Sequence, residues 1–221
     1  MKISLILAIE DEDISDVLKT LKNQTVKSFE LLVISNKNNS VTENLINMYN
    51  RFYDIRYIVA SNKASVNDLK NIALAYVNYD IISFLNSKTT YSINVVETCI
   101  STLYGKSKTI LVLNDDDSEF KKKLNRRNIF DIVNSDNYFV NFEKNDIYLL
   151  KNNYEKRAND IEYISNLIKD GFTAYLYKNA KIYSDNSYDK EILDLMRKEI
   201  ISNNNILLTS KYIKKIFKGV K

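Results

Sequence analysis

The sequence contains no histidine, no proline and no tryptophan, and only three glycines and one cysteine in 221 residues. The absence of histidine removes the commonest metal ligand and the commonest general base, so catalysis in this chain would depend on carboxylates. The single cysteine, Cys99, excludes an intrachain disulfide and a cysteine-ligated zinc site. Because glycine and proline are scarce, turns depend on Asn, Asp and Ser, which tolerate left-handed backbone conformations at some cost.

Long apolar runs are also absent, since no stretch approaches the ~20 residues of a membrane-spanning helix. The chain passes from Met1 and Lys2 directly into a short apolar segment, without a cleavage-type sequence before it. We therefore expect a cytoplasmic protein. The formal net charge of +4 is mild and does not indicate a nucleic-acid partner.

Apolar segments of strand length alternate with amphipathic segments along the first half of the chain. The apolar segments are continuous, which is typical of strands covered on both faces. The intervening segments carry apolar residues at helical spacing, which is typical of helices packed on a sheet. This alternation predicts an α/β fold with a mostly parallel sheet flanked by helices, in which ligands bind at the carboxyl ends of the strands. The predicted strands are 3–9, 29–34, 55–59 and 81–85, and the helical stripes lie within 14–21, 43–52, 69–76 and 96–103.

Three sequence signals mark helix ends. Ser40-x-x-Glu43 and Ser65-x-x-Asp68 are capping boxes that predict where two helices begin. Gly171 predicts the C-terminal end of a later helix.

The second half is less regular. We predict one domain over residues 1–184, followed by a helical appendage over residues 185–221. Further strands are predicted at 109–113, 138–142, 147–150, 173–177 and 180–183, with a helical stripe within 161–168.

Several short motifs follow one another in the first half. They are Asn23-Gln24-Thr25, Phe29-Glu30, Asn62-Lys63-Ala64, Lys70-Asn71 and Phe84-Leu85-Asn86-Ser87-Lys88. In order and spacing they resemble the family 2 glycosyltransferases, whose fold is called GT-A, over about the first 90 residues. The Asn-Gln-Thr motif after an amphipathic helix is the most specific, and the others are specific in combination.

The resemblance implies a nucleotide-sugar half, residues 1–105, and an acceptor half, residues 106–184. The implied partners are a nucleotide sugar, with a UDP-sugar favoured, and a glycan or polysaccharide acceptor. In the family, residues at the carboxyl ends of the strands bind the donor together with Mn²⁺ or Mg²⁺. The matching donor residues here are Ala8, Ile9, Glu10, Ser35, Asn36, Lys70, Asn86 and Lys88.

The metal motif departs from the family pattern. Two aspartates of an Asp-x-Asp motif hold the metal in the family, because the diphosphate leaving group develops negative charge. Here Asn86 offers one neutral oxygen, and Lys88 repels a metal but can meet a diphosphate as a point charge. Lys70 replaces an arginine, which keeps the charge and loses the bidentate fork. The metal ligands are therefore missing from this motif.

Three interpretations of this departure remain open. The donor site is eroded and the protein is a non-catalytic binding or scaffold module, which we favour. Alternatively, Lys70 and Lys88 hold the diphosphate in an active, metal-independent inverting transferase. Finally, the metal site lies elsewhere, with Asp115 and Asp117 as the candidates, although such an acidic run also fits a solvated turn.

A weaker resemblance returns in the acceptor half. Asn159-Asp160 before a helical stripe, followed by Gly171-Phe172, fits the outline of the family's acceptor region. The resemblance implies that Asp160 is the general base that deprotonates an acceptor hydroxyl. The alternative is an N-cap aspartate on the helix that starts at Ile161.

Two basic segments complete the pattern. Residues 120–128 are read as a solvated helix face, with steering of an anionic acceptor as the alternative. The tail, residues 206–221, combines lysines with apolar residues at helical spacing. We expect it to pack on the sheet or on a second copy of the chain, and contact with the inner membrane face is the alternative. Together these features predict a family 2 glycosyltransferase-like protein of glycan or surface-polysaccharide assembly.

Overall fold

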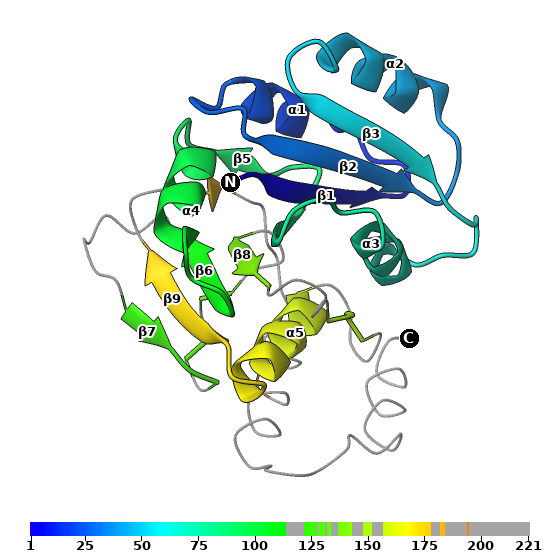
Figure 1. Ribbon diagram of the computed structural model, residues 1–221. Coiled ribbons are helices and arrows are strands. Elements are labelled where there is room, and N and C mark those ends of the chain that lie inside the picture. The colour runs from blue at the N-terminus through cyan, green and yellow to red at the C-terminus, as the bar shows by residue number, and fades with distance from the viewer. Residues whose placement is uncertain are drawn as a thin grey trace.

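A computed structural model of the chain describes residues 1–113, 122–126, 128–130, 132–133, 137–142, 148–151, 157–177, 182–183 and 194 (Figure 1). Helices and strands alternate through residue 113, as the sequence predicts. The helices are α1 (Ser15–Lys22), α2 (Ser40–Tyr49), α3 (Val66–Leu74), α4 (Val95–Leu103) and α5 (Arg157–Lys169). The strands are β1 (Ile3–Ile9), β2 (Phe29–Ser35), β3 (Asp54–Val59), β4 (Ile81–Leu85), β5 (Thr90–Tyr91), β6 (Thr109–Leu113), β7 (Lys122–Leu124), β8 (Tyr138–Asn141), β9 (Thr173–Tyr177) and β10 (Ile182–Tyr183).

In the described residues, a central eight-stranded sheet has the order β3-β2-β1-β4-β8-β6-β9-β7. Strands β1 to β4 are parallel to one another, β8 is antiparallel between β4 and β6, and β9 is parallel to β6. A separate antiparallel pair joins β5 to β10 beyond the end of β4. The predicted α/β fold with a mostly parallel sheet and flanking helices is confirmed.

Each face of the sheet is covered by helices, which explains the continuous apolar strands. Alternate residues of one strand point to opposite faces. Helices α1, α2 and α4 pack with one set of strand residues, and α3 and α5 pack with the other set. Figure 1 shows α1 and α2 on the opposite side of β1 to β3 from α3. In β1 the two sets are Ile3, Leu5, Leu7 and Ile9 on the first face and Ile6 on the second.

The helix ends agree with two of the three predicted signals. Ser65 and Asp68 form the predicted capping box of α3. Gly171 has φ of 94° and follows α5 in a Schellman arrangement, since the Phe172 amide donates to the Leu167 carbonyl. The predicted box at Ser40 is wrong. Asn39 is the N-cap of α2, and its side chain accepts hydrogen bonds from the amides of residues 41 and 42.

Other differences lie in the acceptor half. Residues 122–124 form strand β7 against β9, so the predicted helix face is wrong there. Residues 148–150 form no strand, because the backbone of Leu150 bonds to the side chain of Asn71. Asp115, Asp117 and the tail at 206–221 lie outside the described residues. The division into halves and an appendage remains a prediction.

None of the helices in the described part of the chain combines the length and apolar character needed to cross a membrane.

Candidate functional site

The carboxyl ends of β1, β2 and β4 form one edge of the sheet. Ile9 lies opposite Ser35 in the β1–β2 register, and Leu7 lies opposite Leu85 in the β1–β4 register. The fold therefore brings together the predicted donor residues that end or follow these three strands. They are Ala8, Ile9, Glu10, Ser35, Asn36, Asn86 and Lys88.

The polar side chains at the carboxyl end of β2 donate hydrogen bonds to nearby backbone carbonyls. The buried hydroxyl of Ser35 donates to the Lys37 carbonyl at 2.8 Å, and the Asn36 amide donates to the Ala64 carbonyl at 3.4 Å. Lys37 in turn pairs with Asp11 at 2.6 Å, across the ends of β2 and β1. Ser35 and Asn36 carry no charge, and their side chains are already engaged in these bonds.

The segment after β4 is a tight turn centred on Asn86. The Asn86 side-chain oxygen accepts from the Lys88 amide at 3.1 Å and from the Ser87 hydroxyl at 3.3 Å. The Thr89 hydroxyl accepts from the Asn86 amide at 3.0 Å. The side chain of Lys88 is exposed. This turn therefore carries the exposed ammonium group of Lys88 at the edge of the sheet. The side-chain oxygen of Asn86 is already engaged in hydrogen bonds within the turn.

A divalent metal does not fit the residues of this turn. Hard cations prefer carboxylate oxygens, and the turn supplies only the neutral, already engaged oxygen of Asn86 beside the cationic Lys88. In the described part of the chain, no three acidic, histidine or cysteine side chains gather into a group that could hold a metal. The candidates Asp115 and Asp117 are outside that part.

Lys70 and Asp160, which are far apart in the sequence, form a buried ion pair. The Lys70 ammonium lies 3.1 Å from each carboxylate oxygen of Asp160, and the two side chains are 8% and 0% exposed. The Tyr138 hydroxyl donates to the same carboxylate at 2.5 Å. Lys70 comes from α3, Tyr138 from β8 and Asp160 from the first turn of α5. The pair therefore connects the two predicted halves.

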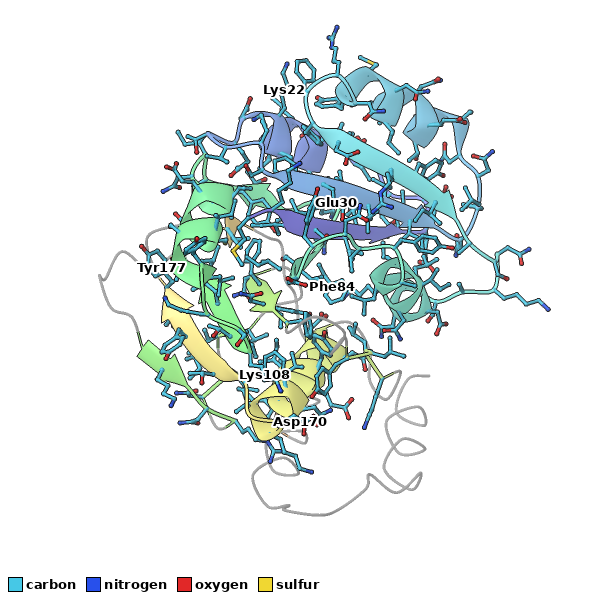
Figure 2. All side chains as sticks on the ribbon, in the orientation of Figure 1. Lys22, Glu30, Phe84, Lys108, Asp170 and Tyr177 are labelled. Carbon is cyan, nitrogen blue, oxygen red and sulfur yellow. The ribbon has the colours of Figure 1, made fainter. Side chains whose placement is uncertain are left out.

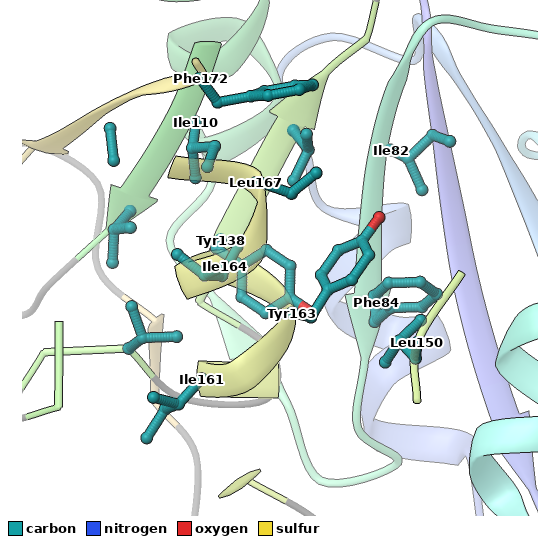
Figure 3. Packing of buried hydrophobic residues seen from close by; sticks show 14 of the residues in the cluster. Ile82, Phe84, Ile110, Tyr138, Leu150, Ile161, Tyr163, Ile164, Leu167 and Phe172 are labelled. Carbon is teal, nitrogen blue, oxygen red and sulfur yellow. The ribbon is translucent and has the colours of Figure 1, made fainter. Parts of the chain in front are cut away.

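Aromatic rings enclose this pair. The Lys70 ammonium lies 5.1 Å from the ring centre of Phe84, the residue labelled near the end of β4 in Figure 2. Phe84 also contacts Tyr138 and Tyr163 edge to face (Figure 3). Burial raises the pKa of the Tyr163 hydroxyl, and the negative charge of Asp160 raises it further. In the described structure that hydroxyl has no hydrogen-bond partner.

The surroundings of Asp160 bear on its two predicted roles. Helix α5 begins at Arg157, so Asp160 lies within the first turn and the N-cap interpretation is wrong. A carboxylate in the first turn is stabilised by the positive end of the helix dipole. A general base must also reach the hydroxyl proton that it removes. Asp160 is fully buried and bonded to Lys70 and Tyr138 in this state.

Sequence reasoning missed the structural roles of two family motifs. The Gln24 amide donates to the Ser92 carbonyl at 2.9 Å and accepts from the Val96 amide at 3.1 Å, which satisfies a donor at the start of α4. Thr25 adds a bond to Glu97 at 2.9 Å. The Asn-Gln-Thr motif thus joins the α1–β2 loop to α4. The available signal in the sequence was the polar Asn-Gln-Thr motif directly after an amphipathic helix.

Glu30 has a similar structural role at the opposite edge. Its buried carboxylate accepts from the Ser4 hydroxyl at 2.6 Å, from Arg56 at 2.7 Å and from both the backbone and side-chain nitrogens of Asn78. These four residues connect the amino ends of β1, β2 and β3 with the segment that leads into β4. A glutamate inside an apolar strand segment was the available signal.

Asn71 holds the segment at Leu150 beside the ion pair. Its amide donates to the Leu150 carbonyl and accepts from the Leu150 amide, both at 2.8 Å. The Lys70-Asn71 dipeptide therefore binds α3 to two separate segments of the second half.

Comparison with known proteins agrees with this architecture. The sequence profile described as Glycosyl transferase family 2 matches residues 9–172, which is most of the chain. The chain belongs to this family. No curated protein matches its sequence.

Solved structures share the fold. One is TarS of S. aureus, with a TM-score of 0.69 and 16% sequence identity over 93% of this chain and 41% of that one. The chain thus spans less than half the length of TarS. A structure of TarS 1–349 in complex with UDP-GlcNAc has a TM-score of 0.67 and 13% identity over 94% of this chain and 68% of that one. The mannosyltransferase PcManGT from Pyrobaculum calidifontis, in complex with GDP-Man and Mn²⁺, has a TM-score of 0.67 and 10% identity, covering 96% and 67% of the two chains.

Proposed function

We propose that this protein binds a nucleotide sugar at the carboxyl edge of β1, β2 and β4 without a divalent metal in the turn after β4. It would act in glycan or surface-polysaccharide assembly. The observation that carries the proposal is the turn itself, in which Asn86 closes the backbone and Lys88 extends an ammonium group at the edge. An ammonium group can neutralise a diphosphate directly, as a point charge.

The structural neighbours support a nucleotide sugar as the ligand. TarS 1–349 was solved with UDP and with UDP-GlcNAc, and PcManGT with GDP-Man. These neighbours have the same fold and were solved with a nucleotide or a nucleotide sugar, which supports a ligand of this class. We favour UDP because two of these complexes contain it.

For an active enzyme the reaction would invert the sugar. The acceptor oxygen would form a bond to the anomeric carbon while the bond from that carbon to the diphosphate breaks, and its electrons leave with the diphosphate. Asp160 would take the proton of the acceptor hydroxyl, and Lys88 would stabilise the leaving group. Ala8, Ile9, Glu10, Ser35 and Asn36 would line the nucleoside end of the donor.

A second function is favoured by a different observation. Lys70 and Asp160 are both buried and bonded to each other, so in this state neither is available to a substrate. A non-catalytic binding or scaffold module derived from a transferase would retain such a pair. Such a module would bind its partner through the lysine-rich tail at 206–221. The partner would be a second copy of the chain or a membrane surface at the cytoplasmic side.

Isothermal titration calorimetry tests these proposals. Purified protein is titrated with UDP, UDP-sugars and GDP-sugars, with Mn²⁺ and with EDTA. We expect binding of equal affinity in both conditions. Binding that requires Mn²⁺ would overturn the metal-independent site and direct attention to Asp115 and Asp117. The absence of binding to every nucleotide would overturn the donor site and leave the non-catalytic module.

A further inference from the structure

The Lys70–Asp160 pair joins the lysine that the family resemblance assigns to the donor diphosphate to the aspartate that the proposed reaction makes its general base. Lys70 would hold the donor diphosphate, and Asp160 would accept a proton from the acceptor. In the structure each neutralises the other, at 3.1 Å and almost completely out of solvent. We propose that this ion pair is an autoinhibitory contact, in which Lys70 masks Asp160 until a donor diphosphate takes the ammonium group. This inference rests on the proposed donor site.

The two partners of the ion pair differ in how many other groups stabilise them. The described contacts of the Lys70 ammonium are the carboxylate of Asp160 and the face of the Phe84 ring. Asp160 also accepts from the Tyr138 hydroxyl at 2.5 Å and lies in the first turn of α5. A carboxylate retains two sources of stabilisation when the ammonium leaves, namely the hydroxyl and the helix dipole. Departure of Lys70 would therefore leave Asp160 charged and oriented.

The lysine at position 70 is suited to a change of partner. Lysine carries a compact charge on a flexible four-carbon chain, so its ammonium can exchange one anion for another. The side chain leaves α3 in the middle of the helix, and Phe84 places the ammonium beside the last residues of β4. A buried ammonium without an anion is unfavourable. Lys70 therefore changes partner only when a second anion, such as a diphosphate, is present at that edge.

Tyr138 has the role of a positioning residue in this scheme. Its hydroxyl comes from β8, which pairs with β4 in the central sheet. Its ring packs against Phe84 and Tyr163, which fixes the direction of the hydroxyl (Figure 3). Loss of that hydroxyl leaves Asp160 more dependent on Lys70 and strengthens the masking contact.

These relations predict opposite effects from two conservative substitutions. Asp160→Asn removes the anion that competes for Lys70, so UDP affinity should rise about tenfold, a usual size for coupling between two sites. Tyr138→Phe strengthens the competition, so UDP affinity should fall severalfold. The Lys70→Met/Asp160→Asn double variant should lose this increase in UDP affinity, because it lacks the Lys70 ammonium group that would bind the diphosphate.

The measurement is calorimetric titration of UDP into the full chain, with thermal unfolding to establish that each variant is folded. Glu30→Gln is the matched control, because it removes the charge of a buried carboxylate that pairs with Arg56 at the opposite end of the strands. Its UDP affinity should equal that of the wild type. If Asp160→Asn fails to fold, the fall in affinity with Tyr138→Phe still tests the proposal.

The outcomes separate this inference from the proposed function. Unchanged UDP affinity in Asp160→Asn and Tyr138→Phe, with binding by the wild type, overturns the masking contact and leaves the donor site intact. No nucleotide binding by the wild type or by Asp160→Asn overturns both. A rise with Asp160→Asn that persists in the double variant also overturns the proposal, because Lys70 would then not be the group released.

Discussion

At the scale of single residues, the proposed donor site depends most on Lys88. Its side chain is exposed at the carboxyl edge, in a turn whose backbone is closed by Asn86. The turn does not need the ammonium group, so the charge can be removed without changing the backbone.

We predict that Lys88→Ala lowers UDP affinity by about ten- to a hundredfold, because a hydrogen bond to a charged group contributes about 1.5–3 kcal/mol. Calorimetric titration of UDP measures the effect. Lys2→Ala is the control, since Lys2 is an exposed lysine at the amino end of β1 and its loss should leave UDP affinity unchanged. Equal affinities of Lys88→Ala and wild type would contradict the assigned role of Lys88.

At the scale of secondary-structure elements, the Asn-Gln-Thr motif holds α4 in place. Gln24 supplies both an acceptor and a donor to the backbone around the start of α4. Helix α4 covers one face of the sheet with Val96, Cys99 and Leu103. Cys99 is fully buried there, and this burial raises the pKa of its thiol.

We predict that Gln24→Ala lowers the free energy of unfolding by about 1–3 kcal/mol, because it removes the acceptor of the buried Val96 amide at the start of α4. Urea unfolding followed by circular dichroism measures the change. Asn23→Ala is the matched control, since the neighbouring Asn23 side chain is exposed and its loss should change stability by less than about 0.5 kcal/mol. Similar losses in the two variants would rule out a specific role for the Gln24 amide.

At the scale of the whole molecule, the Lys70–Asp160 pair and the Asn71–Leu150 bonds join the first half to the second. The two charged residues are 90 positions apart in the sequence, and the pair is nearly inaccessible to solvent. Removal of one member of a buried pair leaves an uncompensated charge, whereas removal of both charges does not.

A double-mutant cycle tests this connection. Lys70→Met and Asp160→Asn should each lower the free energy of unfolding by about 3 kcal/mol, and the double variant should lose less than the sum of the two. Asparagine at position 160 keeps an acceptor for the Tyr138 hydroxyl, so the cycle isolates the charge interaction. Urea unfolding of the four proteins gives the coupling, and strictly additive losses would show that the two charges do not interact.

Local patterns in the sequence determined most of the fold. Continuous apolar strands, helical stripes and the box at Ser65 and Asp68 predicted the elements through residue 113, because each signal depends on neighbours in the chain. The family followed from short motifs in order, before any contact between them was known. The predicted cap at Ser40 was wrong for the same local reason, since the adjacent Asn39 offers a competing side-chain oxygen.

The tertiary structure alone decided which charged groups meet. The sequence placed Lys70 and Asp160 in separate roles, because spacing along the chain contains no information about contacts between distant helices. Packing of α3 and α5 on the same face of the sheet brings the two side chains together and excludes water from them. The same packing determined that Glu30 and Gln24 hold strands and helices in place. Local propensity thus determined the helices and strands. Tertiary packing, which buries Lys70 and Asp160 against each other, determined that these two charged groups are paired.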